Sequence, residues 1–192
     1  MKYLKYIGAF IIGYIIDLLL DKHNKKIEYN KGVGLNYISA ILWPILLYFK
    51  GFSLNTFLFA ITTSLMFSSS KIDIKYKEIP DLYNLSIFIL GILYICNNKS
   101  NIAGLLPGGV YLFVFLSIVM ILSGSLGAGD VKMSGIGFFI GKSLLLEFLS
   151  YAFLSAAIFG IFLLIFKKKS KNDTFAFGPF ISLSAYIVYL LY

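Results

Sequence analysis

Two aspartates beside apolar runs are the residues whose types and surroundings point most clearly to chemistry. Asp130 ends a stretch of glycines and small residues, 123–130, and Asp73 lies three residues after the serine triplet 68–70. Two carboxylates held close together can share one proton, because repulsion between like charges raises one pKa while the other group stays ionised. One can then activate water while the other donates a proton. The pair therefore predicts hydrolysis by general acid and base catalysis.

The residues around both aspartates fit this interpretation but leave a simpler one open. The small residues before Asp130 let another backbone, such as that of a substrate, approach the carboxylate. Pro80 stops any helix that continues from Asp73. In the simpler interpretation, each aspartate caps a helix or pairs with a neighbouring lysine, Lys75 or Lys132.

The composition places these aspartates in a polytopic membrane protein. The chain has 192 residues, of which 59% are hydrophobic and 14% are charged, and its mean hydropathy is +0.85. These values nearly exclude a water-soluble fold. A span needs about 20 residues, so the chain holds about eight at most and has no room for a separate soluble domain. We expect one all-α membrane bundle over residues 1–192.

The apolar runs predict where the transmembrane helices lie. They cover residues 4–20, 37–50, 54–70, 82–97, 106–124, 131–141, 144–166 and 174–192. The sixth run is too short to cross by itself, and the total becomes seven if it merges with the seventh run. Gly137 and Gly141, four residues apart, predict close helix packing in this run.

The lysines predict how the bundle is oriented. All 17 basic residues are lysines, and they lie in short clusters between the apolar runs, which argues against nucleic-acid binding. With eight spans, twelve lysines fall on one side and five on the other. The positive-inside rule makes the richer side cytoplasmic, with both aspartates on that side and both termini outside the cell membrane.

The other ionisable residues offer little for catalysis. Cys96 is the single cysteine and His23 the single histidine, so we expect no metal site and no cofactor. Asp17 and Asp21 are a rival carboxylate pair, four residues apart on one helix face. We favour a structural role for them, at the interface or with polar partners.

Three segments resemble motifs of the type IV prepilin peptidases, a family of intramembrane aspartic proteases. Gly127–Lys132 is similar to the family's Gly-x-Gly-Asp-x-Lys motif, and Asp73–Asp81 to its first-aspartate motif, in which proline follows seven residues later. The segment Phe177-Gly178-Pro179-Phe180 resembles the element that opens the family's last helix. The motifs stand in the family's order and span most of the chain.

The resemblance implies a role for each matching residue. Asp73 and Asp130 would be the catalytic pair, Gly127 and Gly129 would shape the loop, and Pro80 and Asp81 would support the site. Lys75 and Lys132 would bind lipid phosphate or tune the pair, although an interfacial lysine that only snorkels is as simple an interpretation.

The resemblance also implies a substrate. The expected activity is an endopeptidase that removes the short basic leader from prepilin or pseudopilin precursors at the cytoplasmic face, without metal or cofactor. Its partners are then these precursors and membrane lipids. The cut would fall after a glycine and before a long apolar helix.

One departure from the larger family members narrows the expected activity. Those proteins carry paired cysteine motifs that bind zinc between the first two helices, in a domain associated with N-methylation. Here a short cytoplasmic loop, 21–36, stands in that place and has no cysteine. We therefore expect a compact peptidase and do not extend methyltransferase activity to it.

Two other classes of function remain open at this point. A small proton- or cation-coupled transporter would need its carboxylates near the middle of the membrane. A scaffold subunit of a secretion or pilus assembly would cleave no peptide bond at all.

Overall fold

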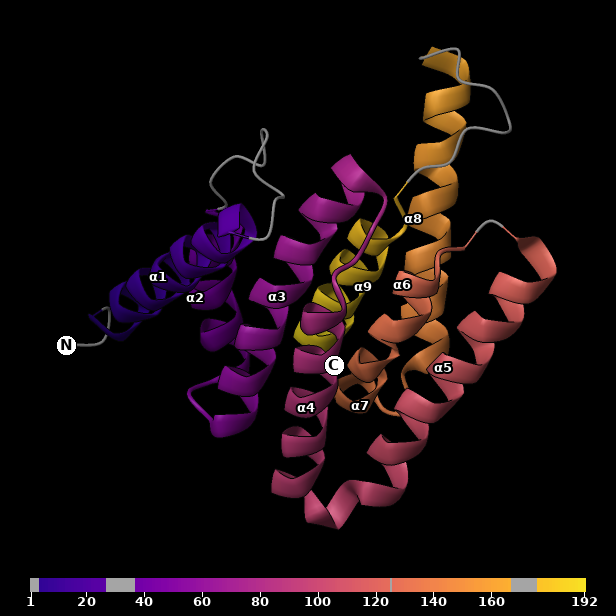
Figure 1. The fold of residues 1–192 in the computed structure, drawn as a ribbon. Helices are drawn as coiled ribbons and strands as arrows, with labels where there is room; N and C mark the ends of the chain where they lie inside the picture. Colours follow the sequence, from indigo (N-terminus) through magenta and orange to yellow (C-terminus); the bar gives the residue numbers. More distant parts are fainter. Residues whose placement is uncertain (1–3, 27–36, 125, 167–175) are drawn as a thin grey trace.

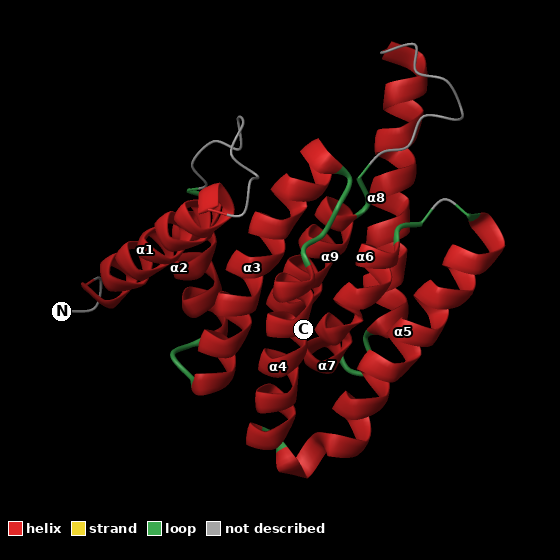
Figure 2. Cartoon of the chain, viewed as in Figure 1, coloured by secondary structure: helices red, strands yellow, loops and turns green. Residues whose placement is uncertain are grey.

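The fold of the chain is given by a computed structural model, which describes residues 4–26, 37–124, 126–166 and 176–192. These residues form helices without any strand (Figures 1 and 2). The α-helices are α1 (Leu4–Lys26), α2 (Ile38–Lys50), α3 (Leu54–Tyr76), α4 (Asp81–Asn97), α5 (Ile102–Ser123), α6 (Ala128–Lys132), α7 (Gly137–Ile140), α8 (Leu145–Phe166) and α9 (Gly178–Leu191). Two short 3-10 helices, η1 (Lys99–Asn101) and η2 (Met133–Ile136), complete the described part.

Apolar side chains cover the outside of the bundle, and many polar side chains lie inside it. Leu122 of α5 is 81% exposed and Leu146 of α8 is 77% exposed, whereas Thr62 and Ser64 of α3 are fully buried. A bundle with this distribution is suited to lipid outside and to interhelical hydrogen bonds inside. Trp43 Nε1, for example, donates to Ser64 Oγ at 3.0 Å.

Two segments of the described chain are long and apolar enough to cross a membrane by themselves, namely Lys99–Ser123 and Leu145–Phe166. Helices α2, α4 and α9 are apolar but shorter, and α1 and α3, with 23 residues each, contain buried polar residues. The predicted all-α membrane bundle is therefore confirmed. The number of spans, eight or seven, stays a prediction.

The sixth apolar run is not one continuous helix. It folds as the succession α6, η2 and α7, which begins at Ala128 and is mostly buried against α4 and α5 (Figure 1). Irregular backbone at membrane depth is tolerated where protein rather than lipid surrounds it. The run does not merge with α8, because Gly141 adopts a φ of +71° and the chain turns there. The N–H of Lys142 then donates to Gly104 O at 2.8 Å.

Close packing of glycines explains how this short segment fits beside α5. A Cβ on Gly108 of α5 would lie 2.4 Å from the carbonyl oxygen of Gly137, and one on Gly137 would lie 2.5 Å from the carbonyl oxygen of Gly108. The two backbones therefore touch, as in other small-residue helix contacts. The predicted packing role of Gly137 is confirmed, with Gly108 as its partner.

The break between α3 and α4 sets the position of the first motif. Helix α3 ends at Tyr76, where Lys77 takes a left-handed conformation with a φ of 59° and its N–H donates to Asp73 O at 2.9 Å. Pro80 is the N-cap residue of α4 and cannot donate the backbone hydrogen bond that a continuous helix needs. As a result, Asp73 lies in the last turn of α3 and Asp81 in the first turn of α4.

Polar contacts fasten the neighbouring helices at this end of the bundle. Asn24 Nδ2 donates to Ser68 Oγ at 3.1 Å, and Tyr83 OH donates to Asn24 Oδ1, which joins α1, α3 and α4. Ser70 Oγ and Ser182 Oγ lie 2.7 Å apart between α3 and α9.

The predicted loop 21–36 starts later than expected, because α1 continues to Lys26, and residues 27–36 lie outside the described part.

Candidate active site

Asp73 is buried at the meeting point of α3 and α9. The residue is 6% exposed. Its Oδ2 accepts a hydrogen bond of 2.9 Å from the backbone N–H of Gly178. Gly178 is the first residue of α9, where unpaired N–H groups and the helix dipole favour a negative charge. Burial raises the pKa of Asp73 above its ordinary value, and the hydrogen bond from the Gly178 N–H partly offsets this rise by favouring the ionised form.

Asp130 lies in the short helix α6 and is also 6% exposed. Its Oδ2 accepts a hydrogen bond of 3.2 Å from the backbone N–H of Gly127, while its Oδ1 is buried and without a partner in the described part of the chain. Burial raises the pKa of Asp130 to about 7, and the negative charge of Asp73 adds to the rise. The two carboxylates thus interact, and Asp130 keeps its proton up to about pH 7.

Both carboxylates line one cleft of about 300 Å³. Its walls are the residues that follow α3, the start of α4 and the loop that leads into α6; they include Lys77, Glu78, Ile79, Asp81, Gly127, Ala128, Gly129 and Lys132. Gly129 is closely packed, because a Cβ there would lie 3.0 Å from Ile79 Cβ. The lack of a side chain at Gly129 therefore lets the loop pack against Ile79 of the first motif.

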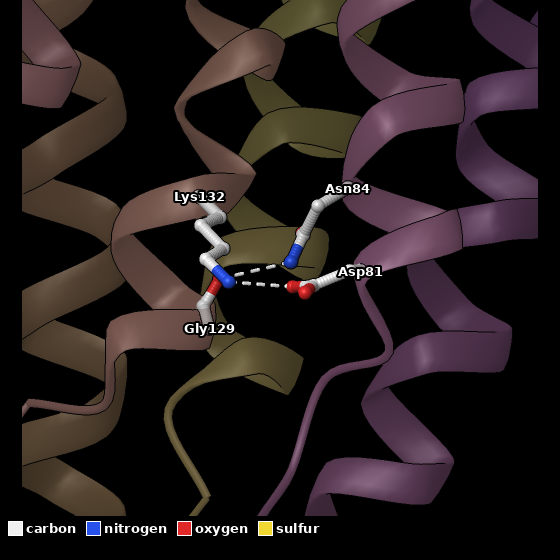
Figure 3. Close-up of polar contacts among 4 residues, drawn as sticks. All are labelled: Asp81, Asn84, Gly129 and Lys132. Atoms are coloured by element: carbon white, nitrogen blue, oxygen red, sulfur yellow. Dashed lines mark hydrogen bonds and ion pairs between the residues drawn. The ribbon is translucent and has the colours of Figure 1, made fainter.

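Contacts between α4 and α6 bridge the two motifs beside this cleft (Figure 3). Lys132 Nζ lies 2.6 Å from Asp81 Oδ1, and their side chains are 52% and 78% exposed. Asn84 Nδ2 donates to Gly129 O at 3.5 Å, a long hydrogen bond. The figure shows Asp81 and Asn84 reaching from α4 towards the segment that carries Asp130. Lys132 thus has an acidic partner at the cleft mouth.

Several candidates lie elsewhere. Lys75 does not line the cleft, and its Nζ stands 5.4 Å from the centroid of the Tyr76 ring. Asp17 and Asp21 are buried on α1 outside the cleft, and Asp21 forms an ion pair of 3.1 Å with Lys25. Among the described residues, no three His, Cys, Asp or Glu side chains are grouped as a metal site would need.

Two residues of the site were not identified from the sequence as part of it. Gly178 was visible only as part of the segment that opens the last helix, because a backbone N–H leaves no trace in the residue type. Asn84 offered a weak signal. It is a polar residue inside the apolar run 82–97, one helical turn after Asp81 and on the same face of the helix.

The fold and the site define a class of protein: a helical membrane protein with two interacting buried carboxylates in one cleft. The model of the type IV leader peptidase family matches residues 60–161. This match covers more than half of the chain and includes both aspartate motifs. The chain belongs to the type IV leader peptidase family.

Curated relatives agree with this assignment. The chain is 25% identical over 163 residues to the prepilin leader peptidase/N-methyltransferase of Neisseria gonorrhoeae, which covers 81% of this chain and 56% of that protein. It is 29% identical over 146 residues to the Bacillus subtilis protein of the same name, covering 73% and 58%. The chain thus spans little more than half the length of these relatives. No solved structure matches it.

Proposed function

We propose that this chain is an aspartic endopeptidase of the membrane that cleaves the leader from prepilin-like precursors. The observation that carries the proposal is the pairing of Asp73 and Asp130 in one cleft, where burial and the charge of Asp73 let Asp130 keep its proton up to about pH 7. Such an unequal pair has one group ready to accept a proton and one ready to donate. Family membership and the names of the relatives favour the same activity.

The proposed mechanism uses each carboxyl in its resting state. Asp73, ionised and held by the Gly178 N–H, takes a proton from water while the water oxygen attacks the scissile carbonyl carbon. Asp130 donates its proton to the carbonyl oxygen, which becomes a hydroxyl. As the tetrahedral intermediate collapses, Asp73 passes its proton to the leaving nitrogen and Asp130 regains one from the hydroxyl. No covalent enzyme intermediate forms.

The surroundings of the cleft favour a substrate with one polar and one apolar part. Four carboxyl residues line the cleft, Asp73, Glu78, Asp81 and Asp130, against two lysines. Beside it lies a groove of about 460 Å³ between α4 and α5, lined by residues such as Leu85, Phe88, Val110 and Phe113. The carboxyl-rich cleft suits a basic leader, and the apolar groove suits an apolar helix.

We place the cleft at the cytoplasmic face of the cell membrane and both termini outside, from the distribution of lysines. In the described chain, Lys71, Lys75, Lys77 and Lys132 lie on the elements that end or begin near the cleft. Lys50, Lys99 and Lys142 lie at the other ends of these helices. Membrane lipids surround the apolar outer surface, and the whole chain would act as one peptidase domain.

The test is cleavage of a precursor with a basic leader, a glycine and an apolar helix, in membranes that contain the wild type or a variant. Asp73→Asn and Asp130→Asn should each abolish cleavage while the protein stays folded. Asp17→Asn is the matched control, because it removes a buried carboxylate outside the cleft. Substantial cleavage by either cleft variant would remove that residue from the mechanism. Equal cleavage by wild type and both cleft variants, or no cleavage by any of them while folded, would point to transport or scaffolding instead.

A further inference from the structure

One face of α4 leads from the carboxylate cleft into the apolar groove. Asp81 and Lys132 line both spaces, so the groove adjoins the cleft. Beyond Asp81, the residues of α4 that line the groove are Asn84, Leu85 and Phe88, at the spacing of one helix face. A chain that enters the groove from the cleft therefore passes Asn84 first.

The side-chain amide of Asn84 makes a hydrogen bond through its nitrogen, whereas its oxygen has no partner in the described chain. The residue is 4% exposed. Its Nδ2 lies 3.5 Å from the carbonyl oxygen of Gly129, and since a carbonyl oxygen only accepts, the nitrogen must be the atom on that side. Its Oδ1 is buried and makes no hydrogen bond within the described chain. A buried acceptor without a donor is costly, and in a native protein it calls for a ligand or another partner.

The missing donor is one that a peptide substrate supplies. A peptide bond can be attacked only when it is accessible and its backbone is locally unwound, and unwinding frees N–H groups. In the apolar groove these groups would lose water without gaining a partner. An acceptor at the entrance of the groove would compensate one of them.

We propose that Oδ1 of Asn84 accepts a hydrogen bond from a backbone N–H of the substrate, at the point where the substrate passes from the carboxylate cleft into the apolar groove. The proposal rests on the proposed peptidase function. Asn84 thereby fixes the register of the substrate, and with it the peptide bond that lies between Asp73 and Asp130. Its contact with Gly129 ties this register to the loop that carries Asp130.

The experiment replaces single substrate amides by esters, which removes one backbone N–H at a time. With the wild type, kcat/KM should fall about 3- to 10-fold at one position near the scissile bond, the loss of one hydrogen bond. Asn84→Leu, which keeps the side-chain size, should lower kcat/KM for the all-amide substrate by a similar factor. It should also abolish the ester effect at that position alone. A residue that only supports Gly129 would leave the ester effect in place.

The outcomes separate this inference from the proposed function. If the wild type cleaves the all-amide substrate in an Asp130-dependent way but no ester position matters, or if Asn84→Leu retains the ester effect, the role of Asn84 is wrong and the peptidase stands. If the all-amide substrate is not cleaved by folded wild type, the peptidase function itself fails.

A second measurement keeps the inference testable if Asn84→Leu does not fold. Asn84→Cys and, as control, Ser86→Cys are made with Asp130→Asn to prevent cleavage and Cys96→Ser to remove the single exposed cysteine. Ser86 lies on another side of α4, next to Leu82 and Tyr83. Substrate cysteines just beyond the scissile bond should form disulfides with residue 84 and not with residue 86. Equal cross-linking at both positions would overturn the proposal.

Discussion

Asp73 Oδ2 accepts a hydrogen bond of 2.9 Å from the backbone N–H of Gly178, although 105 residues separate them in the sequence. A Cβ on Gly178 would lie 2.9 Å from the same oxygen and 3.3 Å from Ile79 Cδ1. Gly178→Ala should therefore push the carboxylate away from its donor. Losing a hydrogen bond to a charged group predicts a fall in kcat/KM of about tenfold or more.

The measurement is kcat/KM for precursor cleavage by Gly178→Ala, with thermal unfolding of the same preparation to show that it is folded. Gly8→Ala is the control glycine, because a Cβ there meets nothing within 4 Å. A folded Gly178→Ala protein that cleaves within about twofold of wild type would contradict a role for this hydrogen bond.

The raised pKa of Asp130 predicts the alkaline limit of activity. Burial and the charge of Asp73 raise this pKa from the ordinary value of 3.8 to about 7. Above about pH 7 the proton that Asp130 must donate is lost, so kcat/KM should decline there, by up to about tenfold per pH unit. A profile from about pH 5 to about pH 9 measures this limit. Asp17→Asn should keep the same alkaline limb, and a flat profile through neutral pH would argue against a protonated Asp130.

The same shift predicts a stability effect with a definite sign. The folded state binds the Asp130 proton more tightly than the unfolded state does, so stability falls as pH rises from about 4 to about 7 and stays lower above that range. The slope is at most about 1.4 kcal/mol per pH unit. Asp130→Asn removes this cost, so the variant should melt at a higher temperature than wild type at alkaline pH, and the difference should vanish in acid. An equal difference at all pH values would contradict the linkage.

Much of this arrangement could be predicted from the sequence, because lipid imposes strong rules on it. The apolar runs located nearly all helices, and Pro80 marked the break that leaves Asp73 at a helix end. The interruption of the sixth run could not be predicted in the same way. Its residues are as apolar as a span, and only tertiary contacts, such as that between Gly108 and Gly137, show that protein surrounds them.

The two missed site residues illustrate a second limit. Gly178 acts through its backbone N–H, and the backbone of every residue but proline carries one, so its type says nothing about the bond to Asp73. The role proposed for Asn84 depends on its side-chain oxygen being buried without a hydrogen-bond partner, and the sequence does not show which atoms are buried. Both features depend on tertiary contacts. The two aspartates, in contrast, could be recognised in the sequence because charged residues are rare beside apolar runs.

The ion pair between Lys132 and Asp81 should contribute little to stability, since both side chains are more than half exposed. Exposed pairs are worth about 0 to 1 kcal/mol and are screened by salt. A double-mutant cycle with Lys132→Ala and Asp81→Ala, followed by thermal unfolding, should give a coupling energy below about 1 kcal/mol that shrinks as salt is added. A larger coupling that is insensitive to salt would show a pair shielded from water.

The contact between α5 and the α6–η2–α7 segment should tolerate no added methyl group. A Cβ on Gly108 would lie 2.4 Å from Gly137 O and 2.7 Å from the Gly141 backbone, and backbone cannot rotate away as a side chain can. Gly108→Ala should therefore cost about 1 to 3 kcal/mol of unfolding free energy, the usual range for overpacking. Gly8→Ala, on the open face of α1, should instead be neutral or stabilise by up to about 1 kcal/mol through helix propensity. Thermal unfolding of both variants measures this difference in stability.

Because α6 holds Asp130, Gly108→Ala should also reduce precursor cleavage at temperatures where the protein is still folded. If the two alanine variants were equally stable, α5 and α7 would not be packed backbone to backbone.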